Sequence, residues 1–390
     1  MSEPPSTYLD HGATTPLRPE VAHAMAEAGS EPLGNPTGSH RPAQRARRLL
    51  EEARDEVAAQ LGRDPGEIIF TSGGTESANL AVLGTLDAVG RDGGSPSVLS
   101  SAVEHPAVRE SCRAAARSSS VTWREVPVDR KGVVDLEALA GLLDEATTLV
   151  AVMLANNETG VVQPLDRVVA LARAVCPTAR VFTDAVQAAP FIDLATGTGA
   201  ADLVSLSAHK LGGPVGVGVL AVRAPGGIAP RQFGGGQERE RRSGTQDVIG
   251  AVGLASALRL AAAGRDESVR RVRALRERLA EGLLDRVDGA LRTVSTGAVT
   301  LPGHLHLCLE GIEREELLLA LSGRGVCASG GSSCASGALE SSYVLAAMGV
   351  PDELARGAVR FTLGHDTTGA DIDRTLAVVP EVVASLRRQR

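Results

Sequence analysis

The sequence predicts an α/β protein with a mostly parallel sheet in a larger domain and a smaller α+β domain after it. Short, near-continuous apolar strands alternate with helical segments from about residue 40 onward, a pattern typical of a parallel sheet covered on both faces. The chain has 390 residues, whereas single cores stop growing at roughly 250–300 residues. Polar residues collect where the strands end, and open α/β sheets bind their ligands at that edge.

The larger domain is predicted over residues 15–255. Residues 41–62 carry a charged amphipathic pattern that predicts a helix ending near Gly62. Strands, most of them followed by a polar loop or a helix, are predicted within residues 67–77, 97–116, 148–160, 179–190, 202–210 and 215–223.

The smaller domain is predicted to combine residues 1–14 with residues 256–390, and to carry a loop of small residues at about 325–340. Its first part has a helical pattern, and its later part alternates between strand and helix. The segments behind this prediction are helices within 253–264, 268–287 and 316–323 and strands within 304–311 and 360–364.

Composition and charge exclude several classes of protein. The net charge is −7 and basic clusters are confined to Arg239–Arg242 and the terminal RRQR, so no nucleic-acid binding is expected. No signal peptide and no apolar run of about 18 residues occurs, so neither secretion nor a membrane span is expected. The five cysteines form no CxxC pair, which disfavours a disulfide framework or a metal site and favours a cytoplasmic protein.

Asp184 and Lys210 follow two consecutive apolar strands. Pyridoxal phosphate (PLP) enzymes need a carboxylate that keeps the pyridine nitrogen protonated and a lysine that attaches to the cofactor aldehyde. A capping aspartate and a surface lysine are the alternative, which the spacing alone favours. The sequence around Lys210, SAHKLGGP, favours the functional reading, because lysine is rare in this chain and this one lies among small residues.

The segment FTSGGTES, residues 70–77, places two glycines and several hydroxyls between a strand and a helix. Backbone N–H groups at a helix N-terminus form an anion site, so this turn is a candidate phosphate cradle. A simple turn capped by Thr75 or Ser77 is the alternative. The segment lacks the P-loop lysine and the GxGxxG pattern, which disfavours nucleotide binding.

Two further strand ends carry polar side chains. His105 precedes Pro106 at the ligand edge and could stack on a cofactor ring, although a lone histidine is more often structural. The NNETG segment, residues 156–160, suits hydrogen bonding to a polar ligand and equally an ordinary Asx turn.

Cys334 lies within ASGGSSCASG, residues 328–337. So many small residues cannot pack a core, so a mobile loop with a reachable thiol is predicted. Cys327 follows a strand-like segment and is expected to be packed. The remaining cysteines, Cys112, Cys176 and Cys308, fall in apolar patterns and are expected to be structural.

Taken together, these segments resemble the cysteine desulfurase family of class V, fold-type I PLP enzymes. The likeness extends along nearly the whole chain, and the motifs occur in family order. They are YLDHGATTP, GNPTGSH, SGGTES, EHPAV, NNETGVVQP, TDAVQ, SAHKLGGPVGVG, GGGQERERRSGT, the cysteine loop, SSYVLAAMG and RFTLG. The resemblance implies a fold-type I PLP-dependent transferase whose larger domain has a seven-stranded sheet.

The resemblance also implies roles for individual residues. Three residues would be catalytic: Lys210 as the cofactor lysine, Cys334 as the persulfide-forming cysteine, and His105 as the residue stacked on the ring and the candidate proton shuttle. The implied cofactor-binding set is Gly74, Thr75, His105, Asn157, Asp184, Gln187, Ser207, His209, Lys210 and Thr245, the last reaching the cofactor of a neighbouring subunit. Arg360 would grip the substrate carboxylate, helped by Asn35 and Asn157.

The implied function is conversion of L-cysteine to L-alanine by a homodimer, with the sulfur passed from Cys334 to an acceptor protein. The pathway that receives the sulfur remains open and includes iron–sulfur cluster assembly, tRNA thiolation and cofactor biosynthesis. The chain reads SGGSSC where the long-loop branch of the family reads SGSAC, and Ala208 replaces a glycine, which leaves partner preference and loop behaviour open. Alternatives are a selenocysteine lyase, a cystine C–S lyase, a class V aminotransferase, a non-catalytic scaffold or a nucleotide-binding module.

Overall fold

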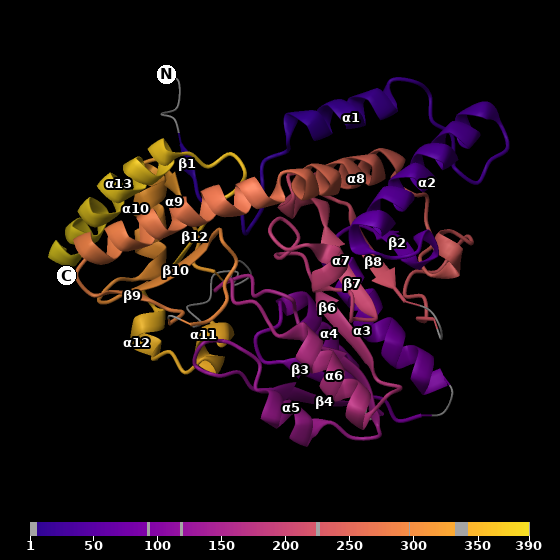
Figure 1. Cartoon of the computed structure of the whole chain (residues 1–390), viewed down its shortest axis with the longest axis horizontal. Coiled ribbons are helices and arrows are strands. Elements are labelled where there is room, and N and C mark those ends of the chain that lie inside the picture. Colours follow the sequence, from indigo (N-terminus) through magenta and orange to yellow (C-terminus); the bar gives the residue numbers. More distant parts are fainter. Residues whose placement is uncertain are drawn as a thin grey trace.

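The computed structural model describes residues 6–91, 94–117, 120–223, 227–295, 297–331 and 342–389. Figure 1 shows two lobes, one built around a large sheet and the other around a small sheet with the C-terminal helix α13 on its outer side. The N-terminal strand lies in the second lobe, so both ends of the described chain are in the same lobe.

The larger lobe contains a seven-stranded sheet in the order β2-β8-β7-β6-β5-β3-β4. Neighbouring strands from β7 to β4 are parallel, and only β8 runs antiparallel to its two neighbours. The predicted mostly parallel sheet is therefore confirmed. Its strands are β2 (Ile68–Thr71), β3 (Ser97–Ser101), β4 (Thr122–Val126), β5 (Thr147–Ala151), β6 (Arg180–Asp184), β7 (Leu203–Ser207) and β8 (Gly218–Val222).

Both faces of this sheet are covered by helices. Successive side chains of a strand point to opposite faces, so Leu149 and Phe182 pack with α3 and α4, whereas Val150 and Val181 pack with α2, α6 and α8. The predicted helix at residues 41–62 is present and ends at Gly62, which is left-handed at φ 61°. The helices are α1 (Pro19–Gly29), α2 (Arg41–Leu61), α3 (Gly74–Arg91), α4 (Pro106–Ala116), α5 (Leu136–Leu142), α6 (Leu165–Val175), α7 (Leu194–Gly197) and α8 (Val248–Ala263), with 3-10 turns η1 (Pro65–Glu67), η2 (Ala208–Lys210) and η3 (Glu238–Glu240).

The smaller lobe contains an antiparallel sheet in the order β12-β10-β9. A second apolar core fills it and includes Leu9 from the N-terminus, because β1 pairs with β11. The strands are β1 (Thr7–Tyr8), β9 (Ala290–Arg292), β10 (His304–Leu309), β11 (Val326–Cys327) and β12 (Ala358–Thr362), and the helices are α9 (Arg265–Arg286), α10 (Arg314–Gly323), α11 (Tyr343–Ala347), α12 (Asp352–Ala355) and α13 (Gly369–Arg388).

The two lobes meet where α8 is followed by α9 (Figure 1). The core of the larger lobe includes Ala261 near the end of α8, and the core of the smaller lobe includes Val272 in α9. The predicted domain limit near residue 255 thus falls inside α8.

Among the described residues, no single helix is long and apolar enough to cross a membrane. The pair α8 and α9, bent by 72° at their junction, meets the length and composition criteria only when taken together.

Candidate active site

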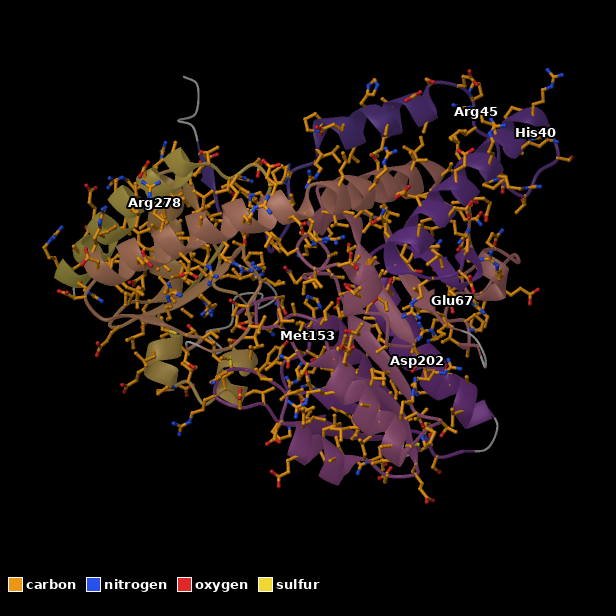
Figure 2. The ribbon with its side chains drawn as sticks, in the orientation of Figure 1. His40, Arg45, Glu67, Met153, Asp202 and Arg278 are labelled. Carbon is orange, nitrogen blue, oxygen red and sulfur yellow. The ribbon has the colours of Figure 1, made fainter. Side chains whose placement is uncertain are left out.

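The carboxyl ends of the parallel strands meet in one pocket of about 260 Å³ between the lobes. Met153, which lines it, is labelled near the centre of the molecule in Figure 2. Most of the residues predicted from the sequence line this pocket. They are Gly74, Thr75, His105, Asn157, Asp184, Gln187, Ser207, His209, Lys210 and Arg360, and Gly12, Ala13, Met153, Ala155 and Val186 complete the lining.

Lys210 reaches the pocket from the short turn η2 after β7. Its Nζ donates hydrogen bonds of 2.6 Å to the backbone carbonyls of Gly12 and of Ala13. The Gly12 carbonyl also accepts a 2.7 Å bond from Gln187 Nε2. The loop after β1 therefore holds both the lysine and a neighbouring pocket residue. The sequence interpretation assigned no role to Gly12 and Ala13, although both lie inside the YLDHGATTP motif.

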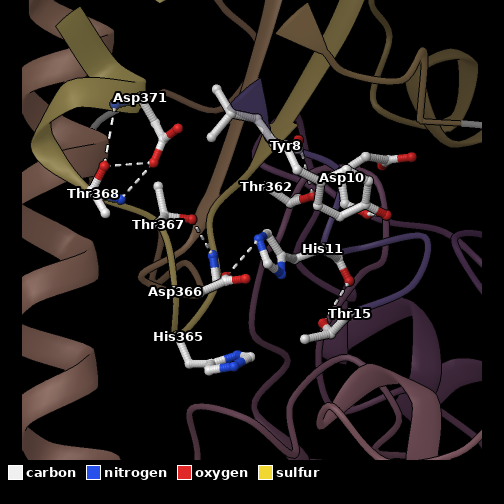
Figure 3. Close-up of polar contacts among 12 residues, drawn as sticks. Tyr8, Asp10, His11, Thr15, Thr362, His365, Asp366, Thr367, Thr368 and Asp371 are labelled. Atoms are coloured by element: carbon white, nitrogen blue, oxygen red, sulfur yellow. Dashed lines mark hydrogen bonds and ion pairs between the residues drawn. The ribbon is translucent and has the colours of Figure 1, made fainter. Parts of the chain in front are cut away.

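This loop is fixed from its far side by the smaller lobe (Figure 3). His11 Nε2 lies 3.2 Å from Asp366 Oδ1, and the Gly12 N–H donates a 2.7 Å hydrogen bond to Thr362 Oγ1. Burial is the main influence on the His11 imidazole and lowers its pKa. Contacts with β12 and the loop after it thus determine where the carbonyl groups that hold Lys210 lie.

Asp184 is the last residue of β6 and is buried, with 7% of its surface exposed. Its Oδ1 accepts a 3.0 Å bond from the N–H of Val186, which orients the carboxylate at the pocket wall. Across the same pocket, Asn157 Oδ1 is buried and has no hydrogen-bond partner within the described chain. A buried acceptor without a partner is costly, so this atom marks a place where a bound molecule can donate.

The N-terminus of α3 lies at this pocket, where FTSGGTES predicts a candidate phosphate cradle. The helix begins at Gly74, and Thr75, Ser207 and His209 line the same pocket. Burial first, and then the charge of Lys210, lower the pKa of His209 to about 4. Its imidazole is therefore neutral near pH 7 and can donate one N–H to an anion.

Glu76 in the first turn of α3 would repel an anion if its charge were uncompensated. Arg242 contacts both of its carboxylate oxygens, at 2.8 and 3.2 Å, and the Ser72 N–H donates to it at 2.7 Å. These hydrogen bonds, with the charge of Arg242, outweigh burial and lower the pKa of Glu76. The ion pair cancels the negative charge beside the cradle.

His105 caps the N-terminus of α4. Its Nδ1 accepts a 3.1 Å bond from the Ala107 N–H, which assigns the proton of the neutral ring to Nε2. Burial lowers the pKa of His105, the charge of Asp184 opposes this effect, and the charge of Lys210 adds to it. The imidazole is held neutral, with one fixed orientation at the pocket wall.

Glu104, which the sequence interpretation passed over, lies fully buried directly before His105. Its Oε1 accepts bonds from Ser101 Oγ at 2.6 Å and from the Met153 N–H at 2.7 Å. Burial outweighs these bonds and raises the pKa of Glu104 to about 8. The EHPAV motif contained this residue, but an acid inside a motif does not reveal its burial.

We expect Glu104 to make stability depend on pH. The folded protein keeps this proton up to about pH 8, whereas the unfolded chain releases it near 4.5, so stability should fall as the pH rises between these values. The Glu104→Gln variant, which carries no titrating group there, should show a shallower slope of urea midpoint against pH. Glu110→Gln, an exposed acid on α4 paired with Arg113, serves as the control. Equal slopes in wild type and Glu104→Gln would contradict the assignment.

Arg360 lies on β12 and is buried, with 2% of its surface exposed. It donates 2.6 Å from Nη1 to the Asn157 carbonyl and 2.8 Å from Nη2 to Asp10 Oδ1, while its buried Nε has no partner among the described residues. Nη1 also lies 3.5 Å from the carbonyl of Gly331. The smaller lobe thus places a guanidinium, the group best suited to grip a carboxylate, opposite the sheet edge.

The pocket fits PLP by the chemistry of its donor groups. A helix N-terminus with hydroxyls and a neutral histidine suits the phosphate, and Asp184 suits the pyridine nitrogen. Asn157, whose side-chain oxygen has no partner in the described chain, and Lys210 line the same pocket. The absent P-loop lysine, by contrast, leaves the nucleotide alternative without support.

Three predicted site residues are not brought into this pocket by the described chain. Asn35 is exposed, and its Oδ1 accepts from the Thr37 N–H and hydroxyl. Thr245 is exposed beyond η3. Cys334 lies outside the described residues, so its role stays a prediction. Of the other cysteines, Cys112, Cys176 and Cys308 are buried and Cys327 is partly exposed, and within the described ranges no cluster of His, Cys, Asp or Glu could hold a metal.

Comparison with known proteins gives consistent similarities along the chain. The profile of the family described as Aminotransferase class-V matches residues 7–375. An IscS-like cysteine desulfurase of Mycobacterium tuberculosis is 41% identical, covering 98% of this chain and 97% of its own. A cysteine desulfurase of Gluconacetobacter diazotrophicus is 40% identical, covering 98% and 94%. A solved NifS-like protein superposes with a TM-score of 0.90 at 34% identity, covering 97% and 100%.

The fold, the pocket and these similarities define a PLP-dependent enzyme of fold-type I. Within that class, the chain belongs to the cysteine desulfurases of the aminotransferase class-V family.

Proposed function

We propose that this protein converts L-cysteine to L-alanine and carries the removed sulfur as a persulfide on Cys334. One observation carries the proposal: Lys210, Asp184 and Arg360 line a single pocket, in a chain whose relatives are cysteine desulfurases. The lysine and aspartate suit PLP chemistry in general, and the arginine suits an amino-acid carboxylate.

Bound PLP supplies the electron sink for cleavage at the substrate Cα–H and C–S bonds. Arg360 holds the substrate carboxylate, using its unpartnered Nε, and Asn157 assists from the facing lobe. Lys210 takes the proton from Cα once its amine is released, and the Gly12 and Ala13 carbonyls receive the resulting ammonium. With PLP bound, Asp184 would keep a proton on the pyridine nitrogen, and Gln187 would hydrogen-bond the ring hydroxyl.

Sulfur transfer then balances as one substitution at sulfur. The Cys334 thiolate attacks the substrate sulfur, the C–S bond breaks, and the proton lost by the thiol ends on the L-alanine that leaves. A free cysteine has a pKa of roughly 8.5, so a base must take this proton. His105 in its resting state already carries a proton on Nε2, because Nδ1 accepts from Ala107. The unprotonated nitrogen is therefore Nδ1, and the ring can take the thiol proton there once the hydrogen bond from Ala107 is released.

We further propose a homodimer in which Thr245 reaches the cofactor of the partner subunit. Thr245 is exposed in this chain, and Phe233 and Val215 nearby in sequence are 76% and 75% exposed, as interface residues are in an isolated chain. The four described cysteines are unpaired, which supports a reducing, cytoplasmic setting. The sulfur acceptor is a protein thiol, and iron–sulfur cluster assembly is one destination for it.

The deciding experiment incubates the PLP-loaded protein with L-cysteine and a dithiol reductant. L-alanine and sulfide should appear in equal amounts, because each transferred sulfur leaves one alanine. Aminotransfer without sulfide would contradict the proposal. A protein with neither turnover nor PLP absorbance would contradict it too, since that result is expected of a non-catalytic scaffold. Selenocysteine run in parallel measures lyase activity toward selenium.

A further inference from the structure

A second polar cavity lies in the smaller lobe, apart from the pocket that holds Lys210. Its volume is about 230 Å³, and its wall includes Arg276, Arg292, Thr300, His304 and His306. Side chains of α9, β10 and the chain between β9 and β10 form it. This space is far larger than the roughly 30 Å³ that one water takes in liquid, so it can hold a small molecule.

Two guanidinium groups give the cavity a positive charge. Arg276 and Arg292 each contact one oxygen of Glu277, at 2.9 and 2.6 Å, so two positive charges share one carboxylate. Arg276 has only 11% of its side chain exposed, and its buried Nε has no partner in the described ranges. One positive charge is left over, together with unused N–H donors.

Two buried histidines of β10 also border the cavity, with side chains on the sheet face opposite to that of Arg292. Both ring nitrogens of His304 and the Nε2 of His306 are buried without a partner in the described chain, while His306 Nδ1 lies 2.7 Å from Thr293 Oγ1. Burial lowers the pKa of His306 to about 3 and that of His304 well below its usual value. The imidazoles are thus neutral and leave the charge of the cavity to the two arginines and Glu277.

We infer that this cavity is a binding site for a small oxyanion, such as a phosphate, a sulfate or a short carboxylate. Guanidinium forks match the paired oxygens of such groups. A cation would meet the excess positive charge, and an apolar ligand would leave the spare guanidinium donors unsatisfied. The inference does not depend on the reaction proposed for the Lys210 pocket.

The cavity adjoins the substrate site through the histidines of β10. His304 also lines a small space of about 30 Å³ together with Lys210 and Gln187. His306 is paired in register with Arg360 on the neighbouring strand β12. A bound anion would therefore lie next to β10, whose neighbouring strand β12 carries the guanidinium of the main pocket.

The site is tested by titrating the PLP-loaded enzyme with inorganic phosphate in a calorimeter and measuring the heat of binding. The cofactor phosphate fills the cradle at α3, and saturating L-alanine occupies Arg360, so the remaining site is measured alone. We expect one saturable site per chain. Arg292→Gln should weaken phosphate binding by about tenfold, the usual effect of losing a charged hydrogen bond. Glu277→Gln should tighten it by about tenfold, because both guanidiniums become free.

The opposite directions of the two changes separate binding from loss of structure. Arg324→Gln removes an exposed arginine of α10's C-terminal cap, paired with Glu381, and should leave phosphate affinity unchanged. Absence of saturable binding to the wild type would overturn the inference. The inference would also be overturned if Arg292→Gln and Glu277→Gln bound phosphate as tightly as the wild type. A loss of phosphate affinity in Arg324→Gln as large as that in Arg292→Gln would overturn it as well.

Discussion

Replacement of Lys210 by alanine is expected to abolish both covalent attachment of PLP and turnover of L-cysteine. The amine is the only one that lines the main pocket in the described chain, and in the proposed mechanism it is both the attachment point and the base at Cα. Loss of an activated nucleophile and a general base together should lower the rate by at least about 10³-fold. The fold should survive, because the Lys210 Nζ donates to the carbonyls of Gly12 and Ala13 in a pocket where water can take its place.

The chain offers a sharp way to measure this, since Lys131 and Lys210 are its only lysines. Borohydride reduction of the PLP-loaded protein, followed by peptide mass analysis, should place the cofactor on the peptide containing Lys210. Lys131→Ala is the matched control and should keep the visible absorbance and the activity. PLP trapped on Lys131, or normal turnover by Lys210→Ala, would contradict the assignment.

Replacement of Cys334 by alanine is expected to leave PLP binding intact while stopping sulfide release. The described residues on either side of Cys334, Gly331 and Ser342, give the reason for this expectation. The Gly331 carbonyl lies 3.5 Å from Arg360 Nη1, and Ser342 Oγ donates a 2.6 Å bond to the buried Glu158. The chain therefore enters and leaves this segment beside the main pocket. Without the thiol, the substrate sulfur has no acceptor, and we expect a loss of at least about 10²-fold.

The measurement compares sulfide and alanine production with the absorbance of lysine-bound PLP in the same samples. Cys327→Ala is the matched control, because Cys327 is a partly exposed thiol on β11 close in sequence to Cys334. It should retain both absorbance and sulfide release. Full desulfurase activity in Cys334→Ala would refute sulfur transfer through this residue while leaving the PLP site untouched.

Periodicity predicted the buried strands of the larger sheet and missed the exposed edge strand β4. Continuous apolar runs predicted β5, β6 and β7, because a strand buried on both faces must be apolar throughout. The edge strand β4, with sequence TWREV, was not predicted, since only Val126 is buried and the others are polar or half-exposed. The pairing of β1 with β11 joins residues more than 300 positions apart, and no local pattern reports such a contact.

The pocket was predictable to the extent that its residues follow strands. Asp184, His105 and Lys210 could be expected to meet, because parallel strands end at one edge of a sheet. Arg360 was named only through the resemblance, since it comes from the other lobe and packs against Asp10. Glu104 and the carbonyls of Gly12 and Ala13 were missed because their importance lies in burial and backbone position.

The sequence by itself therefore determined the class of fold, the candidate attachment lysine and the chemistry of the donor groups, because these depend on residue type and on order along the chain. Tertiary structure alone decided three other matters: which carbonyls hold Lys210, which nitrogen of His105 carries its proton, and that Arg276 and Arg292 share one carboxylate beside a cavity. Each depends on the distance between groups from separate elements and on their removal from water, and neither quantity is written in local sequence.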